Sequence, residues 1–127
     1  MNVARPFKIL IAERNVLVAE AIEAMFVELN GGVQVFTALS LPEARTLALH
    51  EHPDLIVMDA WIEAGPGDKA VRQLLEWSPA SAVYVTATNC DAAFEHRMVR
   101  AGAMGCCDKE AMPAQAGAIV DAIRKRG

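Results

Sequence analysis

Apolar residues follow two patterns along this chain. Short, largely apolar runs alternate with longer stretches in which apolar residues recur every three or four positions. The runs are Phe7–Ala12, Val33–Thr37, Pro53–Asp59, Ser81–Thr86 and Met104–Cys107. The runs predict strands, and the longer stretches predict amphipathic helices. The predicted helices extend from Asn15 to Leu29, from Ser40 to about His52, from Gly67 to Trp77, from about Asp91 to Arg100, and onward from Pro113.

Strands and helices that alternate in this way predict an α/β fold. Each strand–helix pair occupies roughly 20–28 residues, which suits a parallel sheet with right-handed crossovers. We expect a doubly wound, flavodoxin-like sheet of five strands in the order 2-1-3-4-5. A chain of 127 residues without repeats or a low-complexity linker suits one domain, residues 1–127.

The run that ends at Asp59 is the most informative stretch. It is apolar from Leu55 to Met58, between Pro53 and the glycine-rich segment 65–67, and it predicts a strand buried on both faces. Ligands and catalytic groups in parallel sheets lie beyond the carboxyl ends of the strands. Asp59 is therefore the first candidate for chemistry.

Composition narrows the classes of function. The net charge of −4 argues against direct nucleic-acid binding, which needs a basic surface. No apolar run approaches the roughly 18 residues of a membrane span, and the N-terminus lacks a secretory signal. We expect a cytoplasmic protein with no membrane contact. Cys90, Cys106 and Cys107 are expected to be reduced, partly buried thiols, with a redox role as the alternative.

Polar groups lie at or just after the ends of the five predicted strands. They are Glu13, Arg14, Thr37, Asp59, Thr86 and Lys109. At a switch point between the first and third strands, Glu13, Arg14 and Asp59 should be neighbours, with Thr86 and Lys109 facing the same crevice. A carboxylate that attacks phosphorus, with a hydroxyl and an ammonium to hold the charged oxygens, suits phosphoryl transfer.

These segments resemble the receiver domain of bacterial two-component response regulators. The matching pieces are Ile9–Glu13, Pro53–Asp59 with Gly67 eight residues on, Val83–Ala87, and Ala101–Gly105 followed by Lys109. The resemblance implies that Asp59 accepts a phosphoryl group from a sensor histidine kinase, that Thr86 is the switch hydroxyl and that Lys109 binds the phosphate. It also implies a magnesium site made by Glu13, Asp59 and the backbone oxygen of Trp61.

Three positions depart from the family pattern. Arg14 replaces an acid that normally binds the metal, which predicts weakened magnesium binding. The Arg14 guanidinium either pairs with Glu13 or Asp59 in place of the cation, or turns into solvent. Cys106 replaces the aromatic residue that is usual three positions before the lysine. Trp61 either covers the acyl phosphate against water or only packs on its loop.

Several functions stay open at this stage. The first is a phosphorylated receiver, an acceptor rather than a conventional turnover enzyme. It would dock or form homodimers through its fourth helix, fifth strand and fifth helix, with Phe94, Met98 and Val99 as contact candidates, although helical period also explains Val99 as core. The second is a pseudo-receiver, a constitutive interaction module held in one state by Arg14. A nucleotide-binding α/β protein has no support, because no glycine-rich phosphate motif occurs. The chain ends after its fifth helix, as a single-domain regulator or a fragment of a DNA-binding one.

Overall fold

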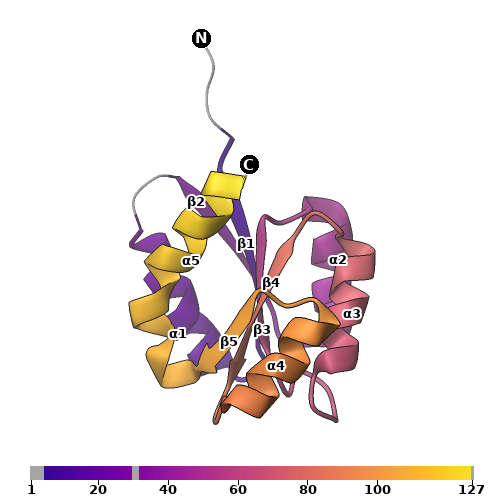
Figure 1. The fold of residues 1–127 in the computed structure, drawn as a ribbon. Coiled ribbons are helices and arrows are strands. Elements are labelled where there is room, and N and C mark those ends of the chain that lie inside the picture. Colours follow the sequence, from indigo (N-terminus) through magenta and orange to yellow (C-terminus); the bar gives the residue numbers. More distant parts are fainter. Residues whose placement is uncertain (1–4, 30–31, 127) are drawn as a thin grey trace.

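Five parallel strands form a single sheet at the centre of the molecule (Figure 1). The structure is a computed structural model that describes residues 5–29 and 32–126. The strands are β1 (Phe7–Ala12), β2 (Val33–Ala38), β3 (Leu55–Asp59), β4 (Ala82–Ala87) and β5 (Gly105–Asp108). The helices are α1 (Val16–Val27), α2 (Leu41–Glu51), α3 (Asp68–Trp77), α4 (Ala92–Ala101), the short 3₁₀ helix η1 (Lys109–Ala111) and α5 (Met112–Arg126).

The strand order is β2-β1-β3-β4-β5, which confirms the predicted doubly wound topology. In the register of the central strands, Ala12 of β1 pairs with Met58 of β3, and Asp59 pairs with Thr86 of β4. Since all strands run in the same direction, their carboxyl ends meet at one edge of the sheet. This register places Asp59 beside Thr86 on one side and beside the residue that follows β1 on the other.

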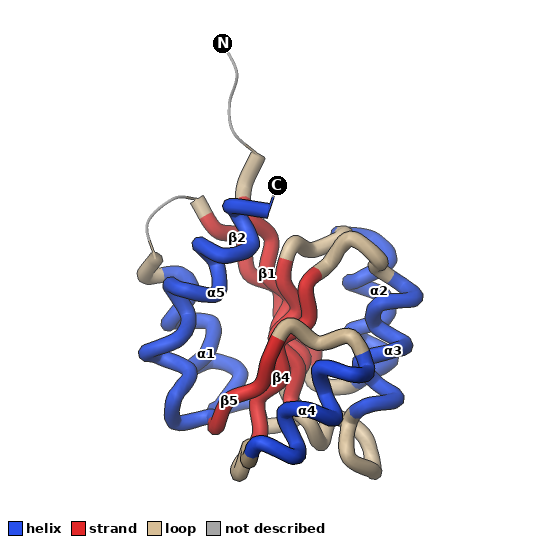
Figure 2. Tube along the Cα trace, viewed as in Figure 1, coloured by secondary structure: helices blue, strands red, loops and turns tan. Residues whose placement is uncertain are grey.

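Two helix layers cover the sheet. In Figure 2, α1 and α5 lie on one side of it and α2, α3 and α4 on the other. Each side has its own buried cluster, one that contains Ile9, Phe26 and Ile119 and one that contains Leu10, Leu74 and Met98. Every residue of β3 is buried, as its continuous apolar run predicts. None of the helices in the described ranges is long and apolar enough to cross a bilayer.

Polar side chains cap three of the helices and set where they begin. Asn15 Oδ1 accepts hydrogen bonds from the amides of Leu17 and Val18, and Asp91 Oδ1 accepts one from Phe94. At α2, Ser40 Oγ accepts from the Glu43 amide, while the Glu43 carboxylate accepts from the amide of Leu39 rather than that of Ser40. Asn15 and Ser40, the residues at which two of the predicted helices begin, are therefore the N-caps of α1 and α2.

The start of β4 is one residue later than predicted, because Ser81 belongs to a buried turn. Its amide donates to the carbonyl oxygen of Ser78 at 3.1 Å, and its hydroxyl donates to the carbonyl oxygen of Pro53. These bonds hold the backbone of Ser81 out of the ladder, so that β4 begins at Ala82 and ends at Ala87. The shift leaves Thr86 within the strand, opposite Asp59.

Tyr84 gives a direct test of packing on β4, because it is the only tyrosine in the chain. Burial, followed by the neighbouring Cys107, raises the pKa of Tyr84 to about 12. We expect the tyrosinate absorbance of the native protein to titrate near pH 12, against about 10 in denaturant. Protonated Tyr84 contributes to the stability of the folded protein. This contribution is complete below the pKa of Tyr84 in the unfolded chain and is lost as the pH rises through its pKa in the folded protein. A native midpoint near 10 would contradict this packing.

Candidate functional site

Four polar side chains from separate segments gather at the carboxyl edge of the sheet. Glu13 directly follows β1, Asp59 ends β3, Thr86 lies near the end of β4, and Lys109 opens η1 after β5. Glu13, Asp59 and Thr86 are 2%, 4% and 1% exposed. Buried carboxylates need a compensating charge or donors, so the contacts of these groups define the site.

Lys109 supplies the compensating charge for both carboxylates. Its Nζ lies 2.8 Å from Glu13 Oε1 and 3.4 Å from Asp59 Oδ1. Burial on its own lowers the pKa of Lys109, but the hydrogen bond to Glu13 and the attraction of Asp59 outweigh it and raise that pKa. The ammonium therefore stays charged at neutral pH.

Backbone amides hold the two carboxylates in place. The Asn15 amide donates to Glu13 Oε2 at 2.8 Å, and the Trp61 amide donates to Asp59 Oδ1 at 3.2 Å. The partners of Asp59 thus converge on Oδ1. Its Oδ2 atom makes no hydrogen bond or ion pair with another residue of the described chain, so that this oxygen has no competing partner there.

The Thr86 hydroxyl is buried beside Asp59 in the sheet register and lacks a hydrogen-bond partner within residues 5–29 and 32–126. A buried hydroxyl without a partner costs about 1–3 kcal/mol, and such groups are uncommon in folded proteins. The hydroxyl can donate to an oxygen that enters the site. The arrangement therefore combines a carboxylate, an ammonium and an unused donor.

Arg14 takes the second of the two orientations considered from the sequence. Its side chain is exposed, and it makes no ion pair with Glu13 or Asp59. Lys109, and not Arg14, is the cation that contacts both carboxylates. Of the two orientations predicted for Arg14, the exposed side chain agrees with the one in which the guanidinium lies in solvent.

The donor set fits a loosely held Mg²⁺. The described part of the chain contains no group of three or more His, Cys, Asp or Glu side chains placed to hold a metal ion. Mg²⁺ commonly takes one or two carboxylates and completes its octahedron with waters and phosphate oxygens. Glu13 and Asp59 supply two carboxylates, although Lys109 competes for the same carboxylate oxygens.

The residues of α4 that were predicted to contact a partner are not all exposed. Met98 is fully buried against the sheet, so its assignment to an exposed contact surface is wrong. Val99 is 46% exposed, so its alternative assignment to the core is wrong. Phe94 packs partly against the core. The face of α4 with Met98 and Ala101 points inward, which turns Val99 toward solvent. Trp61 is also 46% exposed and does not belong to the core.

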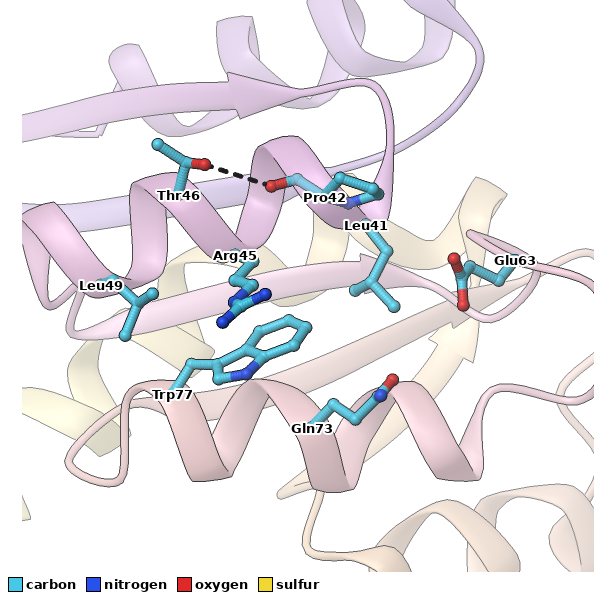
Figure 3. A pocket seen from close by; sticks show the side chains of 8 residues that line it. All are labelled: Leu41, Pro42, Arg45, Thr46, Leu49, Glu63, Gln73 and Trp77. Carbon is cyan, nitrogen blue, oxygen red and sulfur yellow. Dashed lines mark hydrogen bonds between the residues drawn. The ribbon is translucent and has the colours of Figure 1, made fainter.

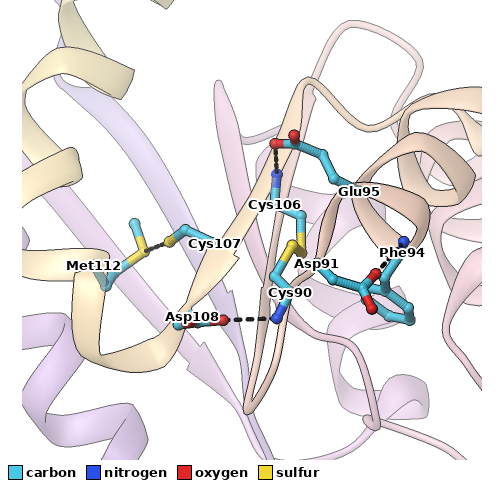
Figure 4. Close-up of a disulfide and its surroundings, with 8 residues drawn as sticks. All are labelled: Cys90, Asp91, Phe94, Glu95, Cys106, Cys107, Asp108 and Met112. Carbon is cyan, nitrogen blue, oxygen red and sulfur yellow. Dashed lines mark hydrogen bonds between the residues drawn. A yellow bond between two sulfur atoms is a disulfide. The ribbon is translucent and has the colours of Figure 1, made fainter.

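Cys90 and Cys106 form a disulfide, and the expectation of three reduced thiols is wrong (Figure 4). Cys90 comes three residues after β4, and Cys106 lies within the neighbouring strand β5. Strand order therefore brings the two cysteines together, although their spacing along the chain does not show it. Cys107 remains free, with its Sγ 3.8 Å from Met112 Sδ on the opposite side of the strand.

A groove between α2 and α3 is separate from this site (Figure 3). It has a volume of about 530 Å³, and the guanidinium of Arg45 lies over the ring of Trp77 at 5.5 Å from its centroid. Neither Asp59 nor Lys109 lines it. The groove therefore takes no part in the chemistry at the strand ends.

Comparison with known proteins agrees with this fold and assigns the chain to a family. The family model of the response regulator receiver domain matches residues 9–124, and the chain belongs to this family. No curated protein sequence matches the chain.

Solved structures of receivers superpose closely on the chain. A LuxR-family two-component response regulator from Aurantimonas sp. SI85-9A1 is 25% identical with a TM-score of 0.78, over 94% of this chain and 85% of that one. The receiver domain of Francisella response regulator 1452 is 21% identical with a TM-score of 0.82, over 96% and 98%. The RcsB response regulator of Salmonella typhimurium has 14% identity and a TM-score of 0.85, over 96% of this chain and 61% of that one.

Proposed function

We propose that this domain, residues 1–127, accepts a phosphoryl group on Asp59 from a sensor histidine kinase in the cytoplasm. The observation that carries the proposal is the buried Asp59 carboxylate, paired with Lys109 and placed in register with a Thr86 hydroxyl that has no partner within the described chain. A purely structural aspartate would need only the ion pair and the Trp61 amide. The Thr86 hydroxyl is an additional donor without a partner, which supports an oxyanion as the group that it binds.

The proposed transfer begins at Asp59 Oδ2. This oxygen attacks the phosphorus of a phosphohistidine, a P–O bond forms, and the P–N bond breaks with its electrons left on the imidazole. The product is an acyl phosphate on Asp59. Lys109 and Thr86 then bind phosphoryl oxygens, and Lys109 exchanges part of its contact with Glu13 for the new charge.

Magnesium is part of the proposal, with reduced affinity. Glu13, Asp59 and the backbone oxygen of Trp61 would hold it, and the bound ion would offset the negative charge of the phosphoryl group. Arg14 adds positive charge where the family pattern has a carboxylate. The loss of one oxygen ligand lowers the affinity of a site for a hard divalent ion.

Phosphorylation would change the affinity of the surface formed by α4, β5 and α5 for a partner or a second copy. Val99 is the exposed apolar residue of α4 that fits a contact there. The half-exposed Trp61, two residues after Asp59, would shield the acyl phosphate from water.

A pseudo-receiver is the second candidate function. Lys109 already bridges Glu13 and Asp59, and Arg14 removes a metal ligand, so the domain has a stable arrangement without phosphate or Mg²⁺. In this case the domain binds its partner constitutively. The two functions differ in whether Asp59 reacts at all.

Acetyl phosphate labelling, read by intact mass over a range of Mg²⁺ concentrations, separates the candidates. We expect a Mg²⁺-dependent gain of one phosphoryl group that is absent in Asp59→Asn. We expect Arg14→Asp to reach half-maximal labelling at a Mg²⁺ concentration roughly tenfold lower than the wild type. A change of about this size in metal affinity is typical when a site gains or loses a supporting group. Arg72→Asp, an equal charge change at an exposed position of α3, is the control.

If Arg14→Asp is labelled and the wild type is not, the wild type is a pseudo-receiver whose phosphoryl chemistry Arg14 blocks. If neither protein is labelled while both remain folded, Asp59 is not a phosphoryl acceptor and the proposed function fails.

A further inference from the structure

The disulfide lies where the proposed switch would have to move. Cys90 follows Thr86 by four residues and precedes Asp91, which caps α4. Its sulfur is bonded to Cys106 on β5, with the two Cα atoms 6.4 Å apart. Cysteine pairs at this Cα separation can be bridged without backbone movement.

A second contact ties the same loop to β5. The Cys90 amide donates to Asp108 Oδ1 at 2.6 Å, and Asp108 directly precedes Lys109 (Figure 4). The segment between Thr86 and α4 is thus attached both to the interior of β5 and to its end. A backbone movement that carries Thr86 toward a phosphoryl group would pull on both attachments, because only three residues separate Thr86 from Cys90.

We propose that Cys90 and Cys106 form a reversible thiol–disulfide site that sets the phosphoryl response of Asp59. In the oxidised form the bridge restrains the loop after Thr86, and phosphorylation is slow. In the reduced form the loop is free to follow Thr86. The regulatory half of this inference rests on the proposed function. That function also places the chain in the cytoplasm, where a disulfide is usually transient, catalytic or redox-sensing rather than structural.

The oxidant is a low-molecular-weight disulfide, written RSSR. The Cys90 thiolate attacks one sulfur of RSSR, which forms a mixed disulfide and releases one RSH after protonation. The Cys106 thiolate then attacks the Cys90 sulfur and releases the second RSH. Two cysteine thiols are oxidised, RSSR is reduced to two RSH, and the two protons pass from the cysteines to the released thiols.

Exposure decides the order of these steps. Cys90 is partly exposed and open to a small reagent, whereas Cys106 is 6% exposed and suits the resolving role. Cys107 is a poor competitor because burial raises the pKa of its thiol and because its side chain contacts Met112 on the other side of β5. Cys107 therefore serves as an internal control for the pair Cys90 and Cys106.

The test equilibrates the full chain with oxidised or reduced glutathione, alkylates free thiols and measures intact mass. We expect one alkylated thiol in the oxidised protein and three in the reduced protein, since the chain has three cysteines. Each sample is also labelled with acetyl phosphate. We expect labelling on the order of tenfold faster in the reduced protein, which is within the usual range of coupling between linked sites.

Two serine variants separate the disulfide from a general redox effect. Cys107→Ser should keep the full difference in labelling rate between the two conditions. Cys90→Ser should label at the fast rate in both. A thiol count that does not change with the glutathione state, or equal labelling rates in the two states, would overturn the inference.

Absence of labelling in both states would reject the proposed function but not the redox site. Hydrogen exchange then tests whether the disulfide restrains the loop. Faster exchange of the amides of residues 86–90 in the reduced wild type, with no redox effect in Cys90→Ser, supports a restraint on this loop. Equal exchange in both states overturns it.

Discussion

Replacing Lys109 with methionine should lower the free energy of unfolding by roughly 2–3 kcal/mol at neutral pH. The Nζ atom of Lys109 contacts Glu13 and Asp59, which are almost completely buried. Removing one partner of a buried ion pair costs about 3–5 kcal/mol, and the 27% exposure of the Lys109 side chain moves the expected loss below that range. Methionine keeps most of the side-chain volume, so that charge rather than packing is tested.

The measurement is urea denaturation of both proteins. Lys125→Met is the matched control, because it makes the same change at an exposed position in the last turn of α5, where surface substitutions stay within about 0.5 kcal/mol. Adding Asp59→Asn to Lys109→Met should recover part of the loss, since it removes one of the two uncompensated charges. A Lys109→Met protein as stable as the Lys125→Met protein would show that Lys109 does not stabilise the carboxylates.

Reducing the Cys90–Cys106 disulfide should lower the free energy of unfolding by about 3 kcal/mol. The bridge joins residues 16 positions apart, and the loss of chain entropy in the unfolded state accounts for a stabilisation of this size in a loop of about 15 residues. The loop includes all of α4, so we expect the wild type to unfold at lower urea concentration when a reductant is present.

Variants at the three cysteines identify the bond responsible. Cys90→Ser should be insensitive to reductant, whereas Cys107→Ser should lose as much stability as the wild type when it is reduced. An equal loss in Cys90→Ser would assign the effect to something other than this disulfide. This comparison is independent of phosphorylation, so that it tests the bond separately from its proposed regulatory role.

Much of the fold could be predicted because its signals are local. The run that ends at Asp59 predicted a two-sided buried strand, and every residue of β3 is buried. The helical period after Asn15 predicted α1. Parallel strands have their carboxyl ends at one edge, so the candidates Glu13, Asp59, Thr86 and Lys109 could be brought together without knowledge of any contact.

Side-chain direction could not be predicted in the same way. The sequence left two orientations open for the Arg14 side chain, whereas the structure has it exposed and brings Lys109, from the other end of the chain, to both carboxylates. Met98 and Val99 are adjacent in α4, and only its packing on the sheet decides that Met98 is buried and Val99 exposed.

By itself, the sequence determined the order of elements, the sheet and the position of Asp59 at the end of a buried strand, because apolar period and strand-end position are local properties of the chain. The tertiary structure decided which charge compensates Glu13 and Asp59, and that Cys90 meets Cys106. Both are contacts between segments whose distance in space depends on how whole elements pack.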